Sequence, residues 1–193
     1  MTHNGFYMHQ HPGEIAPFAD FIRRRKTKHV LEIGTLHGGT TAMWGDAASG
    51  KLISVDLPGG EFGGAAHQLF HANMLERNYK LCKQYPGRFF GVLGDSTDPV
   101  VIEEALSYLD GESLDLLFID GNHTYEGVKA DFTNYSSRVA AGGVVAFHDI
   151  LDTKVHREAG CRVDLFWKEL TGRFRTVEFS VGGDWGGIGA VLL

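Results

Sequence analysis

Short apolar strands alternate with helical segments along most of this 193-residue chain, and this alternation constrains the fold more than any other feature. The pattern predicts strands at residues 29–33, 51–56, 88–93, 114–120 and 144–147. It predicts helices at residues 14–26, 40–48, 65–85, 98–109, 125–140 and 163–170. Such alternation is typical of an α/β domain in which helices cover both faces of a parallel sheet. Two further strands, at residues 174–181 and 187–193, have no helix between them and are expected to be antiparallel.

Composition and charge argue against nucleic acid and membrane as partners of this chain. The net charge is −6, which is not the basic footprint of a nucleic-acid-binding domain. No apolar stretch approaches the roughly 18 residues that cross a bilayer, and Cys82 and Cys161 are too few for a disulfide framework. We therefore expect one cytoplasmic domain over residues 1–193 that binds a small molecule, not nucleic acid or membrane. His3, His9 and His11 are expected to lie in a mobile polar segment.

The first predicted strand runs into a glycine-rich turn that suits a cofactor. Glycines stand at positions 34, 38 and 39, where the backbone can approach a ligand and the next helix offers free N–H groups. Leu36 occupies the place of the second glycine of a dinucleotide-binding turn. S-adenosylmethionine (SAM) carries no phosphate, so this departure favours SAM over NAD. Asp56 ends the next strand, where an acid can accept hydrogen bonds from both ribose hydroxyls.

Chemically reactive side chains follow two later strands. Asp120 and His123 follow the strand at 114–120, and His148 and Asp149 follow the strand at 144–147. Because ligands of parallel sheets bind outside the carboxyl ends of the strands, these side chains are expected to meet in one cleft. Asp120, His148 and Asp149 could bind one cation: Mg²⁺ would suit the carboxylates, whereas Mn²⁺, Fe²⁺ or Zn²⁺ would suit the histidine better. His123 could then act as general base on a substrate hydroxyl that the cation makes more acidic.

The ordered motifs resemble those of class I SAM-dependent methyltransferases with a Rossmann-like, seven-stranded, mostly parallel sheet and an antiparallel C-terminal strand. The turn at 31–41 is similar to that of catechol-type O-methyltransferases, and Asp120-Gly121-x-His123 followed by His148-Asp149 resembles the family that includes macrolide-sugar O-methyltransferases and cephalosporin-hydroxylase-like proteins. The resemblance implies metal-assisted O-methylation of a sugar, polyol or phenol. It implies that SAM contacts Glu32, Gly34, Thr35, Gly38, Thr40, Asp56, Asp95, Ser96 and Asp120. It implies that Asp120, His148 and Asp149 bind the metal and that His123 is the base, although the catechol type has an acid at position 148 and a lysine at position 123.

Two other functions remain open from the sequence. Asp120, His123 and His148 could instead form a two-histidine, one-carboxylate Fe(II) site for oxygenation on the same fold. The chain could also be a SAM-binding module without catalytic activity. A homodimer is common in this class. Residues 57–71 are expected to form part of a lid over the substrate, and residues 152–160 are expected to contact the substrate.

Overall fold

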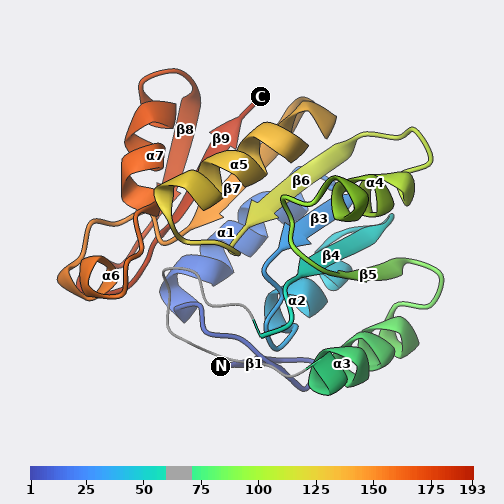
Figure 1. Ribbon diagram of the computed structural model, residues 1–193. Coiled ribbons are helices and arrows are strands. Elements are labelled where there is room, and N and C mark those ends of the chain that lie inside the picture. Colours follow the sequence, from blue (N-terminus) through green and yellow to red (C-terminus); the bar gives the residue numbers. More distant parts are fainter. Residues whose placement is uncertain (60–70) are drawn as a thin grey trace.

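The computed structural model describes residues 1–59 and 71–193, which fold around a sheet with strand order β5-β4-β3-β6-β7-β9-β8 (Figure 1). Its strands are β3 (Val30–Ile33), β4 (Leu52–Asp56), β5 (Phe89–Leu93), β6 (Leu114–Ile119), β7 (Val139–His148), β8 (Arg175–Phe179) and β9 (Ile188–Leu192). Neighbouring strands from β5 to β7 pair in parallel, whereas β9 pairs antiparallel with both β7 and β8. The predicted α/β sheet with an antiparallel C-terminal strand is confirmed.

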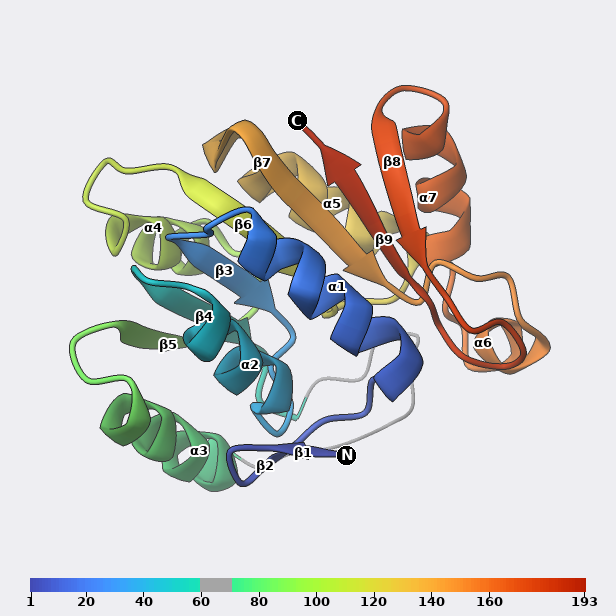
Figure 2. The ribbon, with the colours of Figure 1, turned by 180° about the vertical axis from the view of Figure 1, so that it is seen from behind.

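Helices cover both faces of the sheet, as the two opposite views show (Figures 1 and 2). One face carries α4 (Pro99–Ser107), α5 (Tyr125–Tyr135) and α7 (Val163–Thr171), and the other carries α1 (Pro12–Arg24), α2 (Gly39–Ala47) and α3 (His71–Gln84). Successive residues of a strand point to opposite faces, so β6 serves both cores. Leu117 packs in the cluster beneath α4, α5 and α7, whereas Leu116 and Phe118 pack in the cluster beneath α1 and α2. The central strand is therefore apolar from Leu116 to Ile119, as the sequence indicated.

The helix boundaries follow local signals in some places and tertiary pairing in others. Helix α4 begins as predicted, because Asp98 accepts a hydrogen bond from the Val100 N–H (2.8 Å) and Pro99 occupies the first turn. The helix expected at 125–140 ends at Tyr135 instead, and a 3₁₀ turn (Ser136–Arg138) leads into β7. Strand β7 begins early because Val139 pairs with Leu114 of β6. A short helix that we did not predict, α6 (Lys154–Glu158), follows β7, and residues 65–70 of the helix expected at 65–85 lie outside the described residues.

The N-terminal segment is ordered, so the expectation of a mobile polar terminus was wrong. Strands β1 (Thr2–His3) and β2 (Phe6–Tyr7) form a small hairpin, and His3 Nε2 lies 2.8 Å from the Asp46 carboxylate. His11 caps α1 by accepting a hydrogen bond from the Gly13 N–H. Glu14, which is fully buried, accepts hydrogen bonds from the N–H groups of Val181 and Gly187. This carboxylate ties the start of α1 to the connection between the last two strands.

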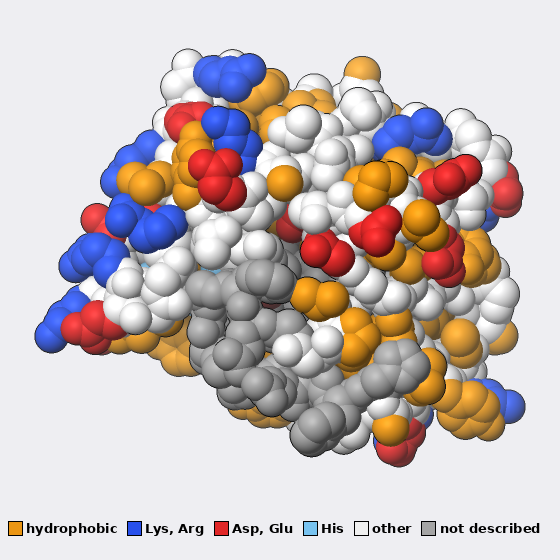
Figure 3. All heavy atoms as spheres, viewed as in Figure 1, with side chains coloured by type: hydrophobic (Ala, Val, Ile, Leu, Met, Phe, Trp, Pro, Cys, Tyr) orange, Lys and Arg blue, Asp and Glu red, His pale blue; other side chains and the backbone are white. Residues whose placement is uncertain are grey.

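The outer surface carries charges of both signs. On the face in Figure 3, Lys and Arg side chains lie next to Asp and Glu side chains over the helices that cover the sheet. Within the described residues, no helix combines the length and the apolar character needed to cross a membrane.

Candidate active site

The turn between β3 and α2 is shaped by residues with left-handed backbone conformations. Gly34 has a φ of +87°, and a Cβ atom added there would lie 2.0 Å from the carbonyl oxygen of Asp120. Only glycine therefore lets the ends of β3 and β6 approach this closely. Leu36 has a φ of +46°, so a side-chain-bearing residue adopts the left-handed conformation at the position where a dinucleotide-binding turn has glycine. This conformation costs free energy, and such strain is concentrated at ligand-binding sites.

Asp56 lies beside this turn at the end of β4 and fastens it. Its Oδ2 atom accepts a hydrogen bond from the Leu36 N–H (3.1 Å). The same carboxylate forms an ion pair with Arg77 of α3. Arg77 also donates to the carbonyl oxygen of Leu36 (2.6 Å). The side chains of Arg77 and Asp56 are 5% and 11% exposed, so this is a nearly buried pair. The pair couples the predicted ribose-binding acid to the loop that precedes α2, a link that the sequence did not reveal.

The residues predicted to contact SAM fall into two groups in the structure. Most of them line one large cavity at the carboxyl ends of the strands: Gly34, Thr35, Thr40, Asp56, Asp95, Ser96 and Asp120. Glu32 and Gly38 are not among the lining residues. Glu32 is buried beneath the turn, where Thr41 and the Trp44 Nε1–H (3.1 Å) donate to its carboxylate. Burial raises the pKa of Glu32 to about 7, although bonds from Thr40 and Thr41 oppose the shift. Glu32 thus holds the turn against α2 from below.

The loop after β5 is held in place from α5. Ser96 Oγ donates to Asp131 Oδ1 (2.6 Å), and the Tyr135 hydroxyl donates to the backbone carbonyl of Ser96 (2.9 Å). Asp131 is fully buried, and burial raises its pKa to about 7. Asp131 and Tyr135 therefore position the loop that carries Asp95 and Ser96, two of the residues predicted to contact SAM.

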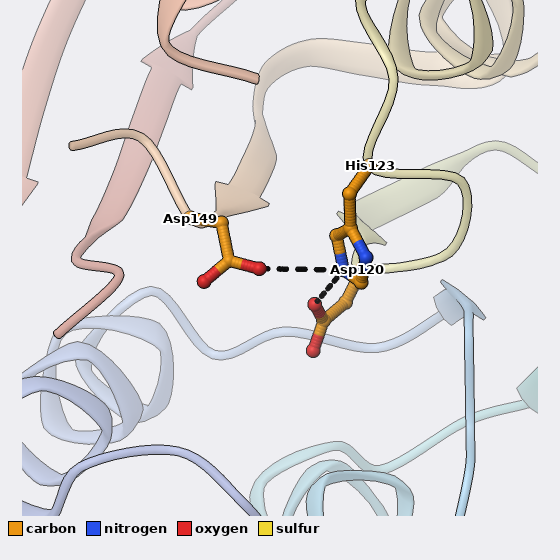
Figure 4. A group of neighbouring side chains, drawn as sticks. All are labelled: Asp120, His123 and Asp149. Carbon is orange, nitrogen blue, oxygen red and sulfur yellow. Dashed lines mark hydrogen bonds and ion pairs between the residues drawn. The ribbon is translucent and has the colours of Figure 1, made fainter. Parts of the chain in front are cut away.

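The catalytic and metal-binding residues predicted after two neighbouring strands lie close together, and Figure 4 shows three of them. His123 Nε2 lies 3.2 Å from Asp120 Oδ1 and 3.3 Å from Asp149 Oδ2, so its ring points between the two carboxylates. His148 Nδ1 lies 3.3 Å from Asp120 Oδ1 and 3.1 Å from Asp149 Oδ1. One ligand atom each from Asp120, His123 and Asp149 lie within 4.8 Å of one another, close enough to hold a metal ion. This group contains His123, the predicted base, whereas the predicted metal ligands were Asp120, His148 and Asp149.

Mutual attraction sets the protonation of this cluster. Burial alone would lower the pKa of His123, but its bond to Asp120 and the charge of Asp149 outweigh burial, so the pKa is raised. The pKa of His148 is raised further, again against burial, by the charges of Asp149 and Asp120. Burial would raise the carboxyl pKa values, yet the nearby His148 holds the pKa values of Asp120 and Asp149 below their ordinary range. Two carboxylates therefore persist in a largely buried site, which favours binding of a positive charge.

The backbone at Asp149 departs from ordinary strand geometry. Asp149 has a φ of +62°, a left-handed conformation that is uncommon outside glycine. A Cβ atom added to Gly186 would lie 2.0 Å from Asp149 Oδ1, so the loop before β9 leaves room only for glycine beside this carboxylate. The turn and the glycine together aim the Asp149 side chain at His123 and His148.

Two further polar residues contact this site: Gln10, which the sequence did not indicate, and His156, which belongs to the stretch at 152–160 expected on the substrate side. Gln10, just before α1, donates from Nε2 to Asp120 Oδ2 (2.7 Å), although 110 positions separate the two residues. His156 of α6 lies with Nε2 3.4 Å from Asp149 Oδ1. Of the described residues, none bonds to the buried atoms Gln10 Oε1 and His148 Nε2. No local pattern in the sequence points to Gln10, whereas the place of His156 after the proposed metal ligands was a signal for a role at this site.

The cavity joins the cofactor half and the catalytic half. Its volume is about 490 Å³, within the range of small-molecule sites. Tyr7 and His9 line it from the N-terminal segment, and Trp185 lines it from the loop before β9. The expected lid at 57–71 falls largely on residues 60–70, which lie outside the described residues.

Comparison with known proteins identifies the family of this chain. A family model described as a methyltransferase domain matches residues 31–150, which contain both the glycine turn and the His148-Asp149 pair. The chain belongs to the methyltransferase domain family. A curated relative from Sinorhizobium fredii, the uncharacterized protein y4gI, is 32% identical over 150 residues. This match covers 77% of the methyltransferase chain but only 16% of the relative's length.

Solved structures confirm the fold of this methyltransferase domain. The O-methyltransferase TomG from Streptomyces achromogenes, in complex with SAM, aligns over 98% of this chain and 82% of its own, with a TM-score of 0.65 and 18% identity. A caffeoyl-CoA O-methyltransferase-like protein from Staphylococcus aureus aligns over 98% and 86%, with a TM-score of 0.68 and 13% identity. The MycE methyltransferase, solved with Mg, SAH and mycinamycin VI, aligns over 92% and 48%, with a TM-score of 0.57 and 16% identity. The methyltransferase fold predicted from the motifs is thus confirmed.

Proposed function

We propose that this methyltransferase domain transfers the methyl group of SAM to a hydroxyl oxygen of a small molecule and that a divalent cation assists the transfer. One observation carries the proposal: the glycine turn, Asp56 and the cluster of Asp120, His123, His148 and Asp149 border one cavity. The two structural relatives TomG and MycE, solved with SAM and with SAH and Mg, support it by analogy of fold.

The residues of the site fit both SAM and a divalent cation. Gly34, Thr35 and Thr40 of the turn and of the start of α2 line the cavity together with Asp56, so backbone groups and a carboxylate border the space for SAM. Two carboxylates, two imidazoles and a buried Gln10 Oε1 atom without a partner among the described residues form a donor set that suits a divalent cation. SAM supplies an electrophilic methyl group, and a divalent cation supplies Lewis acidity that lowers the pKa of a bound hydroxyl.

The chain's own residues perform the remaining steps. Asp56 binds the ribose hydroxyls, while Asp95 and Ser96 border the adenine. Asp120, His148 and Asp149 hold the cation, and the buried walls of the cavity exclude water from the reacting atoms. His123 accepts the hydroxyl proton at Nε2, the atom that faces both carboxylates. The resulting imidazolium is stabilised by Asp120 and Asp149, as their effect on its pKa indicates.

The test begins with calorimetric titration of SAM and then follows transfer of labelled methyl groups to a panel of catechols and sugar diols. We expect transfer to cease after exhaustive chelation and to return with Mg²⁺ or Mn²⁺. Full activity in the metal-free protein would contradict cation assistance and leave His123 as the sole activator. SAM-independent, oxygen-dependent hydroxylation with Fe²⁺ would instead support the two-histidine, one-carboxylate alternative.

A further inference from the structure

His156 is a third imidazole at the edge of the proposed cation site. It lies on a short helix, whereas the other residues of the site follow strands β6 and β7. It lies on α6, with its side chain 15% exposed, and it lines the same cavity as Asp120 and Asp149. Thr153 caps α6 by accepting a hydrogen bond from the His156 N–H (3.1 Å). Helix α6 therefore places the His156 ring beside the Asp149 carboxylate.

A backbone carbonyl fixes which ring nitrogen of His156 is free to bind. Nδ1 lies 3.1 Å from the carbonyl oxygen of Leu151, and a carbonyl can only accept, so Nδ1 carries the hydrogen. In the neutral ring, Nε2 then directs a lone pair toward Asp149 Oδ1, 3.4 Å away. Two electron-rich atoms face each other favourably only if a cation or a proton lies between them. Metal-binding histidines are commonly oriented by a carbonyl at the other nitrogen in this way.

Successive donors at this site have the spacing of neighbouring ligands on one ion. Neighbouring donor atoms form an unbroken series: Asp120 Oδ1 to His148 Nδ1 is 3.3 Å, His148 Nδ1 to Asp149 Oδ1 is 3.1 Å, and Asp149 Oδ1 to His156 Nε2 is 3.4 Å. Donors about 2.0–2.2 Å from one ion lie about 2.8–3.6 Å apart when their bonds meet at square to tetrahedral angles. His123 borders this series at Asp120 Oδ1 and Asp149 Oδ2, where it can still receive a proton.

We propose that His156 is an additional ligand of the cation and that the site therefore selects a transition ion that accepts imidazole over Mg²⁺. Mg²⁺ prefers oxygen ligands in regular octahedral geometry, whereas imidazole suits Zn²⁺, Fe²⁺, Co²⁺ and Ni²⁺. Two imidazoles among four donors match the second class. The inference rests on the proposed function, because it concerns the same cation site.

The test uses Co²⁺ as a spectroscopic probe and two variants of α6. His156→Asn keeps a side-chain N–H for the Leu151 carbonyl but removes Nε2. Lys154→Ala is the matched control, because Lys154 is 78% exposed and pairs only weakly with Glu158 (3.7 Å). Calorimetry measures Co²⁺ and Mg²⁺ affinity, visible absorption of the Co²⁺ protein reports the ligand set, and SAM is titrated into the same samples.

We expect His156→Asn to weaken Co²⁺ binding by at least about tenfold, to change the Co²⁺ absorption bands and to alter Mg²⁺ affinity far less. Lys154→Ala should match the wild type. Unchanged Co²⁺ affinity and bands in His156→Asn would overturn the inference and leave the proposed function intact. Equal losses of Co²⁺ and Mg²⁺ affinity with unchanged bands would overturn it too, because they indicate a structural role. A wild type that binds SAM but no Co²⁺ would refute both cation assignments while leaving SAM dependence in place.

Discussion

Replacement of Asp56 by alanine should have two separable effects, the first of them on stability. The variant leaves the Arg77 guanidinium, which is 5% exposed, without its counter-charge. Breaking a buried ion pair costs about 3–5 kcal/mol. We expect the lower end, because Arg77 keeps its hydrogen bonds to the Leu36 carbonyl and to Asn78 Oδ1. At about 2–4 °C per kcal/mol for a domain of this size, the Tm should fall by about 6–12 °C.

The second effect concerns SAM. Loss of a charge-assisted hydrogen bond to the ribose should cost about 1.5–3 kcal/mol, which raises the Kd for SAM by about 10–150-fold. Calorimetry well below the Tm of the variant measures this change on folded protein. Asp46→Ala is the control, because Asp46 pairs with His3 and is not among the residues that line the cavity.

A double variant separates the two effects. Adding Arg77→Met to Asp56→Ala removes the unpaired guanidinium, so most of the lost Tm should return. SAM affinity should stay low, because the carboxylate is still missing. If the double variant binds SAM as tightly as the wild type, then Asp56 acts only on the fold and the ribose assignment is wrong.

Three further predictions follow from other parts of the site. His123→Ala should lower turnover by about 10²–10⁴ with little change in SAM affinity; unchanged turnover with loss of metal would make His123 a ligand. Gly34→Ala should destabilise the fold by more than the roughly 1 kcal/mol typical of point substitutions, because its Cβ would lie 2.0 Å from the Asp120 carbonyl at a φ of +87°; urea denaturation checks this, and a wild-type midpoint would refute it. Glu32, with a folded pKa of about 7 against an ordinary 4.5, keeps a proton that the unfolded chain releases, so its contribution to stability falls by about 3 kcal/mol as pH rises from 4.5 through 7. Glu32→Gln should flatten this slope in urea denaturation between pH 5 and 8, while Asp131, with a pKa also near 7, keeps a residual slope of the same sign; an unaltered slope would contradict the assignment.

The sequence predicted what local patterns control. Strand β6, which Asp120 follows, and strand β7, which ends at His148, are parallel neighbours with Phe118 opposite Ala146, so the polar residues at their ends had to meet. The rule that ligands bind at the carboxyl ends of parallel strands locates the site from the order of the strands alone. The capping of α4 by Asp98 was equally local.

The rest depended on contacts between distant parts of the chain. Nothing near Gln10 in the sequence indicates a bond to Asp120, and nothing near Asp56 indicates the pairing with Arg77. The left-handed backbone of Asp149 could not be predicted either, because it depends on the space that Gly186 leaves beside the carboxylate. Such features arise from packing and not from propensity.

The ties between Gln10 and Asp120 and between Glu14 and Gly187 have a consequence for folding kinetics. They join residues 110 and 173 positions apart, so one closing loop spans more than half of the 193-residue chain and the other spans most of it. Contacts of such long range carry a large loop-closure entropy and form late relative to local helices. An intermediate that has built its sheet but not docked residues 10–14 would have native-like secondary structure and an incomplete catalytic cleft. Recovery of ligand binding during refolding should therefore lag behind recovery of helical signal, which makes the site a reporter of the final docking step.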